Sequence, residues 1–184
     1  MQIDDRVLVQ RAQQGNTQAI GALYDRHHHH IFRFVWSRTN NQALAEDLTG
    51  EVFTRMVTHL PQYQTRGVPF RAWLYRIARN LIVDHQRQHN QHTIVDIEQA
   101  ANLSVDEDDP MALTETALTR ETLQHALGKL DPVQREVIEL RFLLGLSLQE
   151  VAQTLDKTVS AVKSLQHRGL KSLRRTLATL EIRS

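Results

Sequence analysis

The sequence predicts an all-α protein made of two small helical domains joined by an acidic flexible linker. Apolar residues recur at helical spacing over most of the 184 residues, glycines and prolines number only 7 and 4, and β-branched runs are short. The helical period fades between residues 90 and 115, where an acidic run extends from Asp106 to Asp109. We therefore expect domains at 1–89 and 116–184 and a linker at 90–115.

The first domain should contain four helices, at about 5–14, from 17 onward, at 42–60 and at 70–88. Gly15 follows the first helix and Pro61 follows the third, and both residue types commonly end helices. An apolar stripe on each helix would supply the core. The inward residues expected on the last three helices are Ile20, Leu23, Tyr24, Ile31, Phe34, Leu44, Leu48, Val52, Phe53, Met56, Phe70, Leu74, Ile77, Ala78 and Leu81.

The second domain carries clear signals for helix ends. Helical periodicity resumes over about 114–130. Asp131 and Pro132 then form a good N-cap and first-turn pair, which predicts a helix running to about Phe142. Gly145 should end that helix, because glycine readily adopts the left-handed backbone that closes a helix.

A short helix, a tight turn and a longer basic helix follow, which is the arrangement of a helix-turn-helix. Ser147 and Glu150 read as a capping box opening a helix to Leu155, and the last helix should run from Val159 to about Leu180. Residues 157–184 hold 7 Lys+Arg and 1 acid, which suits a reader of duplex DNA. A solvated face on a packed hairpin is the alternative. The candidate DNA contacts are Ser160, Lys163, Ser164, His167, Arg168, Lys171 and Arg174.

The fourth helix interleaves aromatic residues with arginines. Arginines can hold phosphates and aromatic rings can stack on unpaired bases, so this pattern suits a melted strand better than intact duplex. Charge supports two nucleic-acid-facing modules, since residues 1–95 carry net +4, residues 96–121 net −7 and residues 122–184 net +4. The alternative is that the aromatic side chains are core and the arginines form a wet surface.

Several function classes are disfavoured. No catalytic triad, phosphate-binding glycine loop or paired-acid motif is visible, so we expect no enzyme, no catalytic residue and no cofactor. The absence of cysteine excludes disulfides and cysteine-ligated zinc. There is no signal-peptide pattern, and no apolar stretch long enough to span a bilayer, so no membrane insertion is expected.

The histidines do not form a recognisable metal site. His27–His30 fan around one helix, so they cannot converge on an ion; His27 should face the core and the other three should face solvent. His85, His89 and His92 have ligand-like spacing but lack an accompanying carboxylate motif of the HExxH type. We therefore expect no metal.

Two long motifs give the chain a family resemblance. The stretches 45–53 and 69–80 resemble the second conserved region of extracytoplasmic-function (ECF, group IV) sigma factors of bacterial RNA polymerase. The stretches 130–138 and 145–152, with Val162-Lys163-Ser164 and His167-Arg168, resemble their fourth region. The resemblance covers nearly the whole chain apart from the linker and the extreme termini.

The resemblance implies a sigma factor that binds core RNA polymerase and directs promoter recognition, promoter melting and transcription initiation. Docking on the polymerase would use Glu46, Asp47, Leu48, Glu51, Val52 and Phe53. Recognition and melting of the minus-ten element would use Tyr63, Arg66, Phe70, Arg71, Trp73, Arg76, Arg79, Asn80 and Arg87. The helix-turn-helix would read the minus-thirty-five element.

The resemblance also implies partners and a location. The partners would be bacterial core RNA polymerase, promoter DNA as duplex and as melted strand, and an anti-sigma factor. The protein would be cytoplasmic, or held at the inner membrane by that anti-sigma factor. The linker would be extended on the polymerase, whereas the free protein should be compact, because a relaxed coil of 26 residues spans only about 28 Å.

The chain departs from the family pattern at three places. Gly50 stands where glutamine is usual, Asp156 occupies a turn position that is often glycine, and Leu165-Gln166 replaces a frequent Arg-Leu. The last change leaves the minus-thirty-five preference open. The competing interpretations are a helix-turn-helix regulator that acts without the polymerase core and a helical metal-dependent enzyme.

Overall fold

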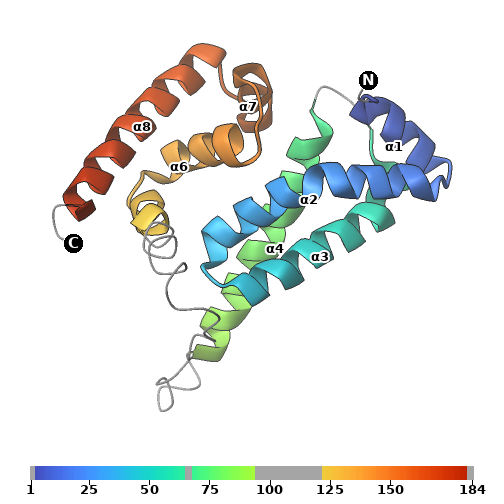
Figure 1. Ribbon diagram of the computed structural model, residues 1–184, viewed down its shortest axis with the longest axis horizontal. Helices are drawn as coiled ribbons and strands as arrows, with labels where there is room; N and C mark the ends of the chain where they lie inside the picture. Colours follow the sequence, from blue (N-terminus) through green and yellow to red (C-terminus); the bar gives the residue numbers. More distant parts are fainter. Residues whose placement is uncertain (1–2, 65–67, 94–121, 182–184) are drawn as a thin grey trace.

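The computed structural model describes residues 3–64, 68–93 and 122–181, and within these ranges every regular element is helical. The N-terminal half, residues 3–93, is a bundle in which α2 contacts α1, α3 and α4 (Figure 1). Side chains of Asp4, Asn16 and Asn41 cap α1, α2 and α3 by accepting backbone N–H groups. The elements are α1 (Asp5–Gln13), α2 (Thr17–Thr39), α3 (Gln42–His59), the short 3-10 helix η1 (Leu60–Gln62) and α4 (Phe70–Thr93).

The predicted helices are confirmed, with one extension. Helix α4 continues to Thr93, whereas the sequence predicted an end near Gln88. No proline or glycine interrupts the polar segment after Gln88, so nothing in the local sequence stops the helix there. The acidic run Asp106–Asp109 and the first part of the helix predicted from residue 114 lie outside the described residues.

The C-terminal half, residues 122–181, begins with a helical segment at 122–128. It continues with α6 (Pro132–Ile138), the π-helical turn η2 (Glu139–Leu143), α7 (Leu148–Leu155) and α8 (Val159–Glu181). The predicted caps are present: Asp131 accepts from two backbone N–H groups, and Ser147 and Glu150 form a complete capping box. Asp156 adopts the left-handed conformation in the turn before α8, where glycine is common in the family.

The helix predicted to run to Phe142 changes form before it ends. After Ile138 the spacing of its backbone hydrogen bonds increases from four residues to five, so that the Leu144 N–H donates to the Glu139 carbonyl at 3.1 Å. Such π turns insert one extra residue per turn and often occur at functional positions. Gly145 then reverses the chain with φ of +65°, and a Cβ at this position would lie 3.0 Å from the guanidinium of Arg71.

A single apolar core runs through both halves of the chain. Residues of α6, η2 and α7, including Val137, Leu140 and Val151, belong to the same buried cluster as Phe34 and Leu74 of the N-terminal half. A smaller cluster, Leu127, Leu130 and Ile138, closes the C-terminal half against α8. The compact arrangement expected for the free protein is therefore present, although its core is shared rather than divided between two domains.

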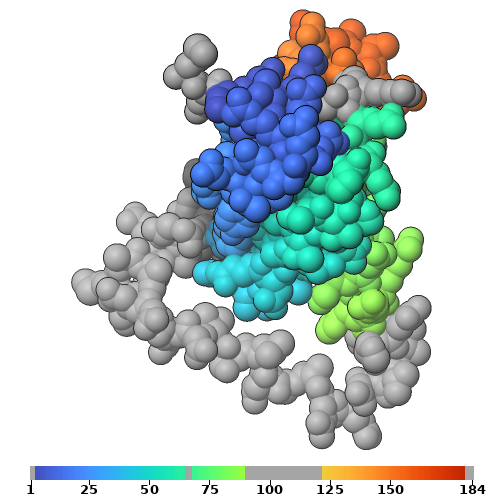
Figure 2. Space-filling view, turned by 90° about the vertical axis from the view of Figure 1, so that its right-hand side faces the viewer, coloured from blue at the N-terminus to red at the C-terminus, as the bar shows by residue number. Residues whose placement is uncertain are grey.

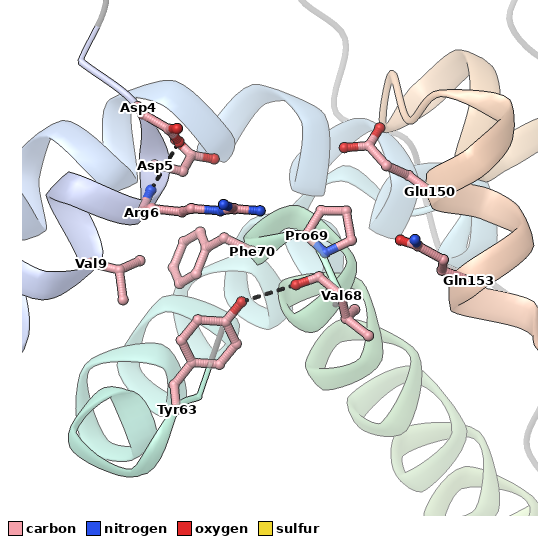
Figure 3. Close-up of a pocket in the computed structure, with 10 residues that line it drawn as sticks. All are labelled: Asp4, Asp5, Arg6, Val9, Tyr63, Val68, Pro69, Phe70, Glu150 and Gln153. Atoms are coloured by element: carbon pink, nitrogen blue, oxygen red, sulfur yellow. Dashed lines mark hydrogen bonds between the residues drawn. The ribbon is translucent and has the colours of Figure 1, made fainter. Parts of the chain in front are cut away.

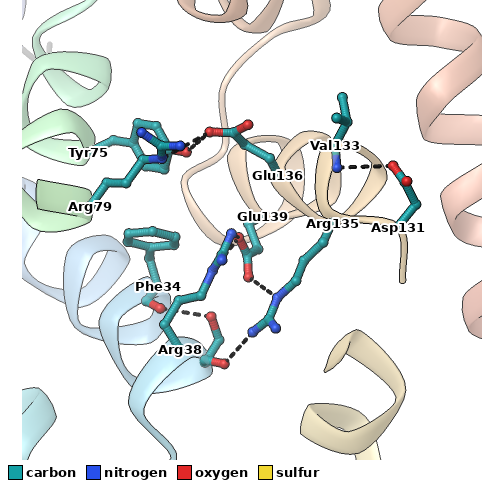
Figure 4. Close-up of polar contacts among 10 residues, drawn as sticks. Phe34, Arg38, Tyr75, Arg79, Asp131, Val133, Arg135, Glu136 and Glu139 are labelled. Carbon is teal, nitrogen blue, oxygen red and sulfur yellow. Dashed lines mark hydrogen bonds and ion pairs between the residues drawn. The ribbon is translucent and has the colours of Figure 1, made fainter. Parts of the chain in front are cut away.

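Polar contacts reinforce this shared core along a seam between α2, α4 and α6 (Figure 4). Glu139 is completely buried and accepts from Arg38 of α2 and, at 2.8 Å, from Arg135 of α6. Arg135 also donates to the backbone carbonyl of Ser37 at 2.8 Å. A buried carboxylate needs such partners, because removing a charge from water costs several kcal/mol.

Loss of the Glu139 charge should destabilise the whole molecule. Glu139→Gln leaves two partly buried guanidinium groups without their counter-ion, so we expect the free energy of unfolding to fall by about 2–3 kcal/mol. Urea denaturation followed by circular dichroism measures this change. The matched control is Glu51→Gln, which breaks the half-exposed Glu51–Arg55 pair and should cost less than about 0.5 kcal/mol. If the free energy of unfolding fell equally in the two variants, the Glu139 charge would not be a special source of stability.

Candidate functional site

The outward face of α8, which we call the reading face, carries every residue that the sequence predicted for duplex DNA. All seven of these side chains are exposed, from Ser160 at its start to Arg174 near its end. The hydroxyl of Thr158 accepts from the Ala161 N–H at 3.1 Å and fixes the beginning of the helix. Helix α8 lies on the side of α6 away from α2 (Figure 1), so the N-terminal half leaves the reading face uncovered.

Gln166, one of the departures from the family pattern, points back into the C-terminal half. Its side-chain oxygen accepts from Arg141 Nε at 2.9 Å, and Arg141 also donates to the carbonyl of Leu146. The neighbouring Leu165 packs against the shared core. Both residues therefore hold α8 in place within the C-terminal half.

The α4 arginine face consists of four of the exposed polar residues of α4, namely Arg76, Arg79, Asn80 and Arg87. The aromatic residues predicted to act with them are more enclosed. Phe70 is only 4% exposed, and Trp73 is half-buried with its ring 4.5 Å from that of Tyr63. Trp73 and Tyr63 thus combine a packing role with a partly accessible surface, whereas Phe70 is core. Arg66 lies outside the described residues.

Arg71 is turned toward the C-terminal half. Its Nη1 donates to the Leu144 carbonyl at 2.5 Å, and its Nε donates to His27 Nδ1 at 3.3 Å. Since Nδ1 accepts this bond, the ring proton of neutral His27 lies on Nε2, which is 2.9 Å from a carboxylate oxygen of Asp5. The Asp5 carboxylate is the close polar neighbour of this buried nitrogen. Contacts from Asp5 to His27 and from His27 to Arg71 thereby connect α1 to the seam.

His30 adds a second histidine to the seam. Its Nδ1 lies 3.0 Å from the Leu143 carbonyl, to which it donates in the appropriate tautomer. Burial lowers the pKa of His30, and the bond to Leu143 offsets only part of this effect. The prediction that His28, His29 and His30 all face solvent holds fully for His29. His30 is half-buried against the C-terminal half, and His28 is half-buried beside Tyr24 and Phe32. His27 faces the core as predicted.

A cavity of about 570 Å³ lies between α1, the segment before α4 and α7 (Figure 3). Tyr63 and Phe70 form an aromatic wall, and Arg6 extends across the opening. Its acidic lining residues, Asp4, Asp5 and Glu150, outnumber this one arginine. The cavity is therefore unsuited to phosphate, and it adds no catalytic constellation to the site.

The outer side of α3 carries the residues predicted to dock on a protein partner. Glu46 and Asp47 are exposed, and Glu51 is half-exposed and paired with Arg55 at 2.8 Å. Figure 2 shows α3, in turquoise, open to solvent beside the blue helices, with the orange C-terminal helices above. Two further predicted docking residues, Val52 and Phe53, are buried, and Leu48 is half-buried. Their contribution would be to hold the helix in place.

Sequence reasoning missed the seam residues. Arg38 lies about 100 positions along the chain from both Arg135 and Glu139, so no local pattern joins it to them. The one available signal was the i, i+4 spacing of Arg135 and Glu139. No cluster of three metal-ligating side chains occurs in the described part of the chain, and none of its helices is apolar enough over sufficient length to cross a bilayer.

Comparison with known proteins agrees with the two-region layout. The family model of sigma-70 region 2 matches residues 23–92, and that of sigma-70 region 4 matches residues 126–175. The region-2 match contains the α4 arginine face and the docking side of α3. The region-4 match contains the helix-turn-helix.

Relatives match over most of the chain. The ECF RNA polymerase sigma factor BldN of Streptomyces coelicolor is 36% identical over 92% of this chain, which spans 64% of that protein's length. The ECF RNA polymerase sigma factor ShbA of Streptomyces griseus is 33% identical, with 91% of this chain and 92% of that protein covered. The structure of CnrH in complex with the cytosolic domain of CnrY superposes with a TM-score of 0.71 at 29% identity, covering 98% of this chain and 99% of that one.

The contacts of Asp5 should make stability depend on acid pH. Burial alone would raise the pKa of Asp5, but the contacts with His27 and Arg26 outweigh it and lower the pKa from 3.8 to about 2. A lowered carboxyl pKa contributes stability that is fully present above pH 3.8 and is lost as the pH falls toward 2. Asp5→Asn should therefore cost about 1–2 kcal/mol at pH 7 and flatten the acid limb of a stability–pH profile. Asp25→Asn, at an exposed site on α2, is the control and should leave the profile unchanged.

Proposed function

We propose that this chain, which belongs to the ECF RNA polymerase sigma factors, uses α3 to bind core RNA polymerase, the α4 arginine face to hold a melted promoter strand and the reading face to contact duplex DNA. The family assignment makes it a factor that directs RNA polymerase in transcription initiation. The observation that carries the proposal is the presence, on one chain and in the family's order, of an exposed acidic docking helix and two separate basic faces.

Each face has the chemistry that its proposed role requires. The reading face presents lysines and arginines for phosphates, with Ser164 and His167 projecting as candidates for base edges. The α4 arginine face lies next to the partly accessible rings of Tyr63 and Trp73, which suits unpaired bases. The carboxylates on α3 suit a partner surface that offers arginines.

Further assignments rest on the family. The order of region 2 and then region 4 supports placement in group IV, with domains at 1–89 and 116–184. Sigma factors are not a class of enzymes, and we propose that this chain has no catalytic activity of its own. Its place of action would be the cytoplasm, where the polymerase works. An anti-sigma factor would regulate it. That factor would alternatively hold the chain at the inner membrane. The related CnrH was solved in complex with the cytosolic domain of CnrY.

Run-off transcription with bacterial core polymerase tests the function directly. Addition of the chain should yield defined transcripts from a promoter that core alone does not use. The double variant Asp47→Arg/Glu51→Arg should abolish these transcripts and weaken core binding by at least about tenfold, because it reverses two charges on the docking side of α3. Surface plasmon resonance with immobilised core polymerase measures the affinity.

The docking assignment has a matched control. Asp25→Arg places a positive charge at an exposed position on α2 instead of α3 and should bind core at the wild-type level. All three proteins should melt at nearly the same temperature. Wild-type core affinity in the α3 double variant would show that polymerase docks elsewhere.

Promoter opening should depend on the α4 arginine face. Arg76→Ala and Asn80→Ala should reduce transcription from a duplex promoter, because each removes a contact with the unpaired strand. A template with a pre-melted bubble should partly restore activity, since the unpairing cost is then removed. The control is Arg33→Ala, an exposed arginine on α2. Equal losses on duplex and bubble templates would mean that these residues act outside melting.

A further inference from the structure

Part of the surface proposed for the melted strand is occupied by the C-terminal half. Arg79 Nε lies 3.4 Å from a carboxylate oxygen of Glu136, and the hydroxyl of Tyr75 donates to the same oxygen (Figure 4). Arg71 donates to the carbonyl of Leu144. Two of the arginines assigned to promoter melting are thus paired with groups from α6 and from the end of η2.

We propose that Glu136 acts as a stand-in for a DNA phosphate, closing part of the α4 arginine face until the two halves of the chain separate. This inference rests on the proposed function, because it assigns a regulation to the same face. A carboxylate and a phosphate make the same charge-assisted hydrogen bonds with a guanidinium group, so one excludes the other. Tyr75 orients the carboxylate from a position that is only 2% exposed.

The closure is coupled to the rest of the seam. Glu136 and Glu139 lie three residues apart on α6 and η2, and Glu139 is buried between Arg38 and Arg135. Because Glu136 sits on α6, a movement of α6 away from α2 and α4 carries its carboxylate away from Arg79. Separation of the halves also withdraws the Leu144 carbonyl from Arg71, so one movement uncovers both arginines.

The two DNA-facing surfaces differ in this closed form. Every predicted contact on the reading face is exposed, whereas Arg71 and Arg79 are engaged by the C-terminal half. The closed protein should therefore bind duplex through α8 and hold a single strand only weakly. Arg79 is paired but still 57% exposed, and Arg76, Asn80 and Arg87 are exposed as well, so weak binding rather than none is expected.

The test compares single-strand affinity in free protein. Fluorescence anisotropy would follow a labelled random-sequence DNA strand of about 12 nucleotides, a length within the usual site sizes. Glu136→Gln keeps the size of the side chain but removes its charge, so affinity should rise by about fivefold, the equivalent of one partly exposed ion pair released. Asp25→Asn changes the net charge equally on exposed α2 and should leave the affinity within about twofold.

A second variant and a distance measurement distinguish uncovering of the α4 arginine face from a general loss of structure. Tyr75→Phe frees the carboxylate from its orienting hydroxyl while Arg79 keeps its counter-ion, so it should raise affinity less than Glu136→Gln. The chain has no cysteine, so dyes can be attached through Val57→Cys on α3 and Thr179→Cys on α8, both exposed sites. Energy transfer should fall in Glu136→Gln and fall further when core polymerase binds.

The outcomes distinguish this inference from the proposed function. Unchanged single-strand affinity in Glu136→Gln would overturn the phosphate stand-in, even if the wild-type protein supports run-off transcription. A rise in affinity equal to that of Asp25→Asn would overturn it as well, since net charge alone would explain the gain. Increased affinity in Glu136→Gln together with failure of the wild type in run-off transcription would support the closure and reject the proposed function.

Discussion

The buried carboxylate of Glu139 is the contact on which the arrangement of the two halves depends. It has no exposure to solvent, and its charge is balanced by Arg38 from α2 and Arg135 from α6. A charge in this position costs free energy unless both partners stay in place. The halves therefore cannot slide gradually past each other, because any shift that moves one guanidinium away leaves the buried carboxylate with only one of its two positively charged partners. This favours two discrete states, closed and separated.

Local backbone chemistry makes that contact possible. The π turn η2 starts at Glu139, and the reversal at Gly145 brings the carbonyls of Leu143 and Leu144 against α2 and α4. A side chain at 145 would meet Arg71 and would also strain a backbone with positive φ. The stretch from Glu139 to Gly145 thus ends a helix, leads into the helix-turn-helix and supplies acceptors to His30 and Arg71. The π turn and the reversal at Gly145 direct these two carbonyls to His30 and Arg71, whereas a continuous α-helix would use them in its own hydrogen bonds.

Features with a local cause could be predicted from the sequence, and features made by distant residues could not. The caps at Asp131 and Ser147, and the exposed polar face of α8, follow from residue type and helical spacing, and the structure has all of them. The aromatic and arginine pattern of α4 predicted a DNA-facing helix but did not indicate which of its side chains are free. Arg71 is bound by His27 and by the Leu144 carbonyl from the other half of the chain, whereas Arg76 is exposed, and no local pattern showed these contacts.

Polymerase docking and separation of the halves are also physically distinct steps. The acidic side of α3 lies away from the seam, so a partner can bind Asp47 while Glu136 and Glu139 are still paired. Docking on α3 therefore does not by itself open the molecule. Two promoter elements nearly two duplex turns apart require a separation of roughly 60 Å, at about 34 Å per turn, which a shared apolar core forbids. In the proposed scheme, contacts with the C-terminal half, made after or alongside docking, would supply the free energy that breaks the seam, and the paired arginines of α4 would then become fully available to DNA.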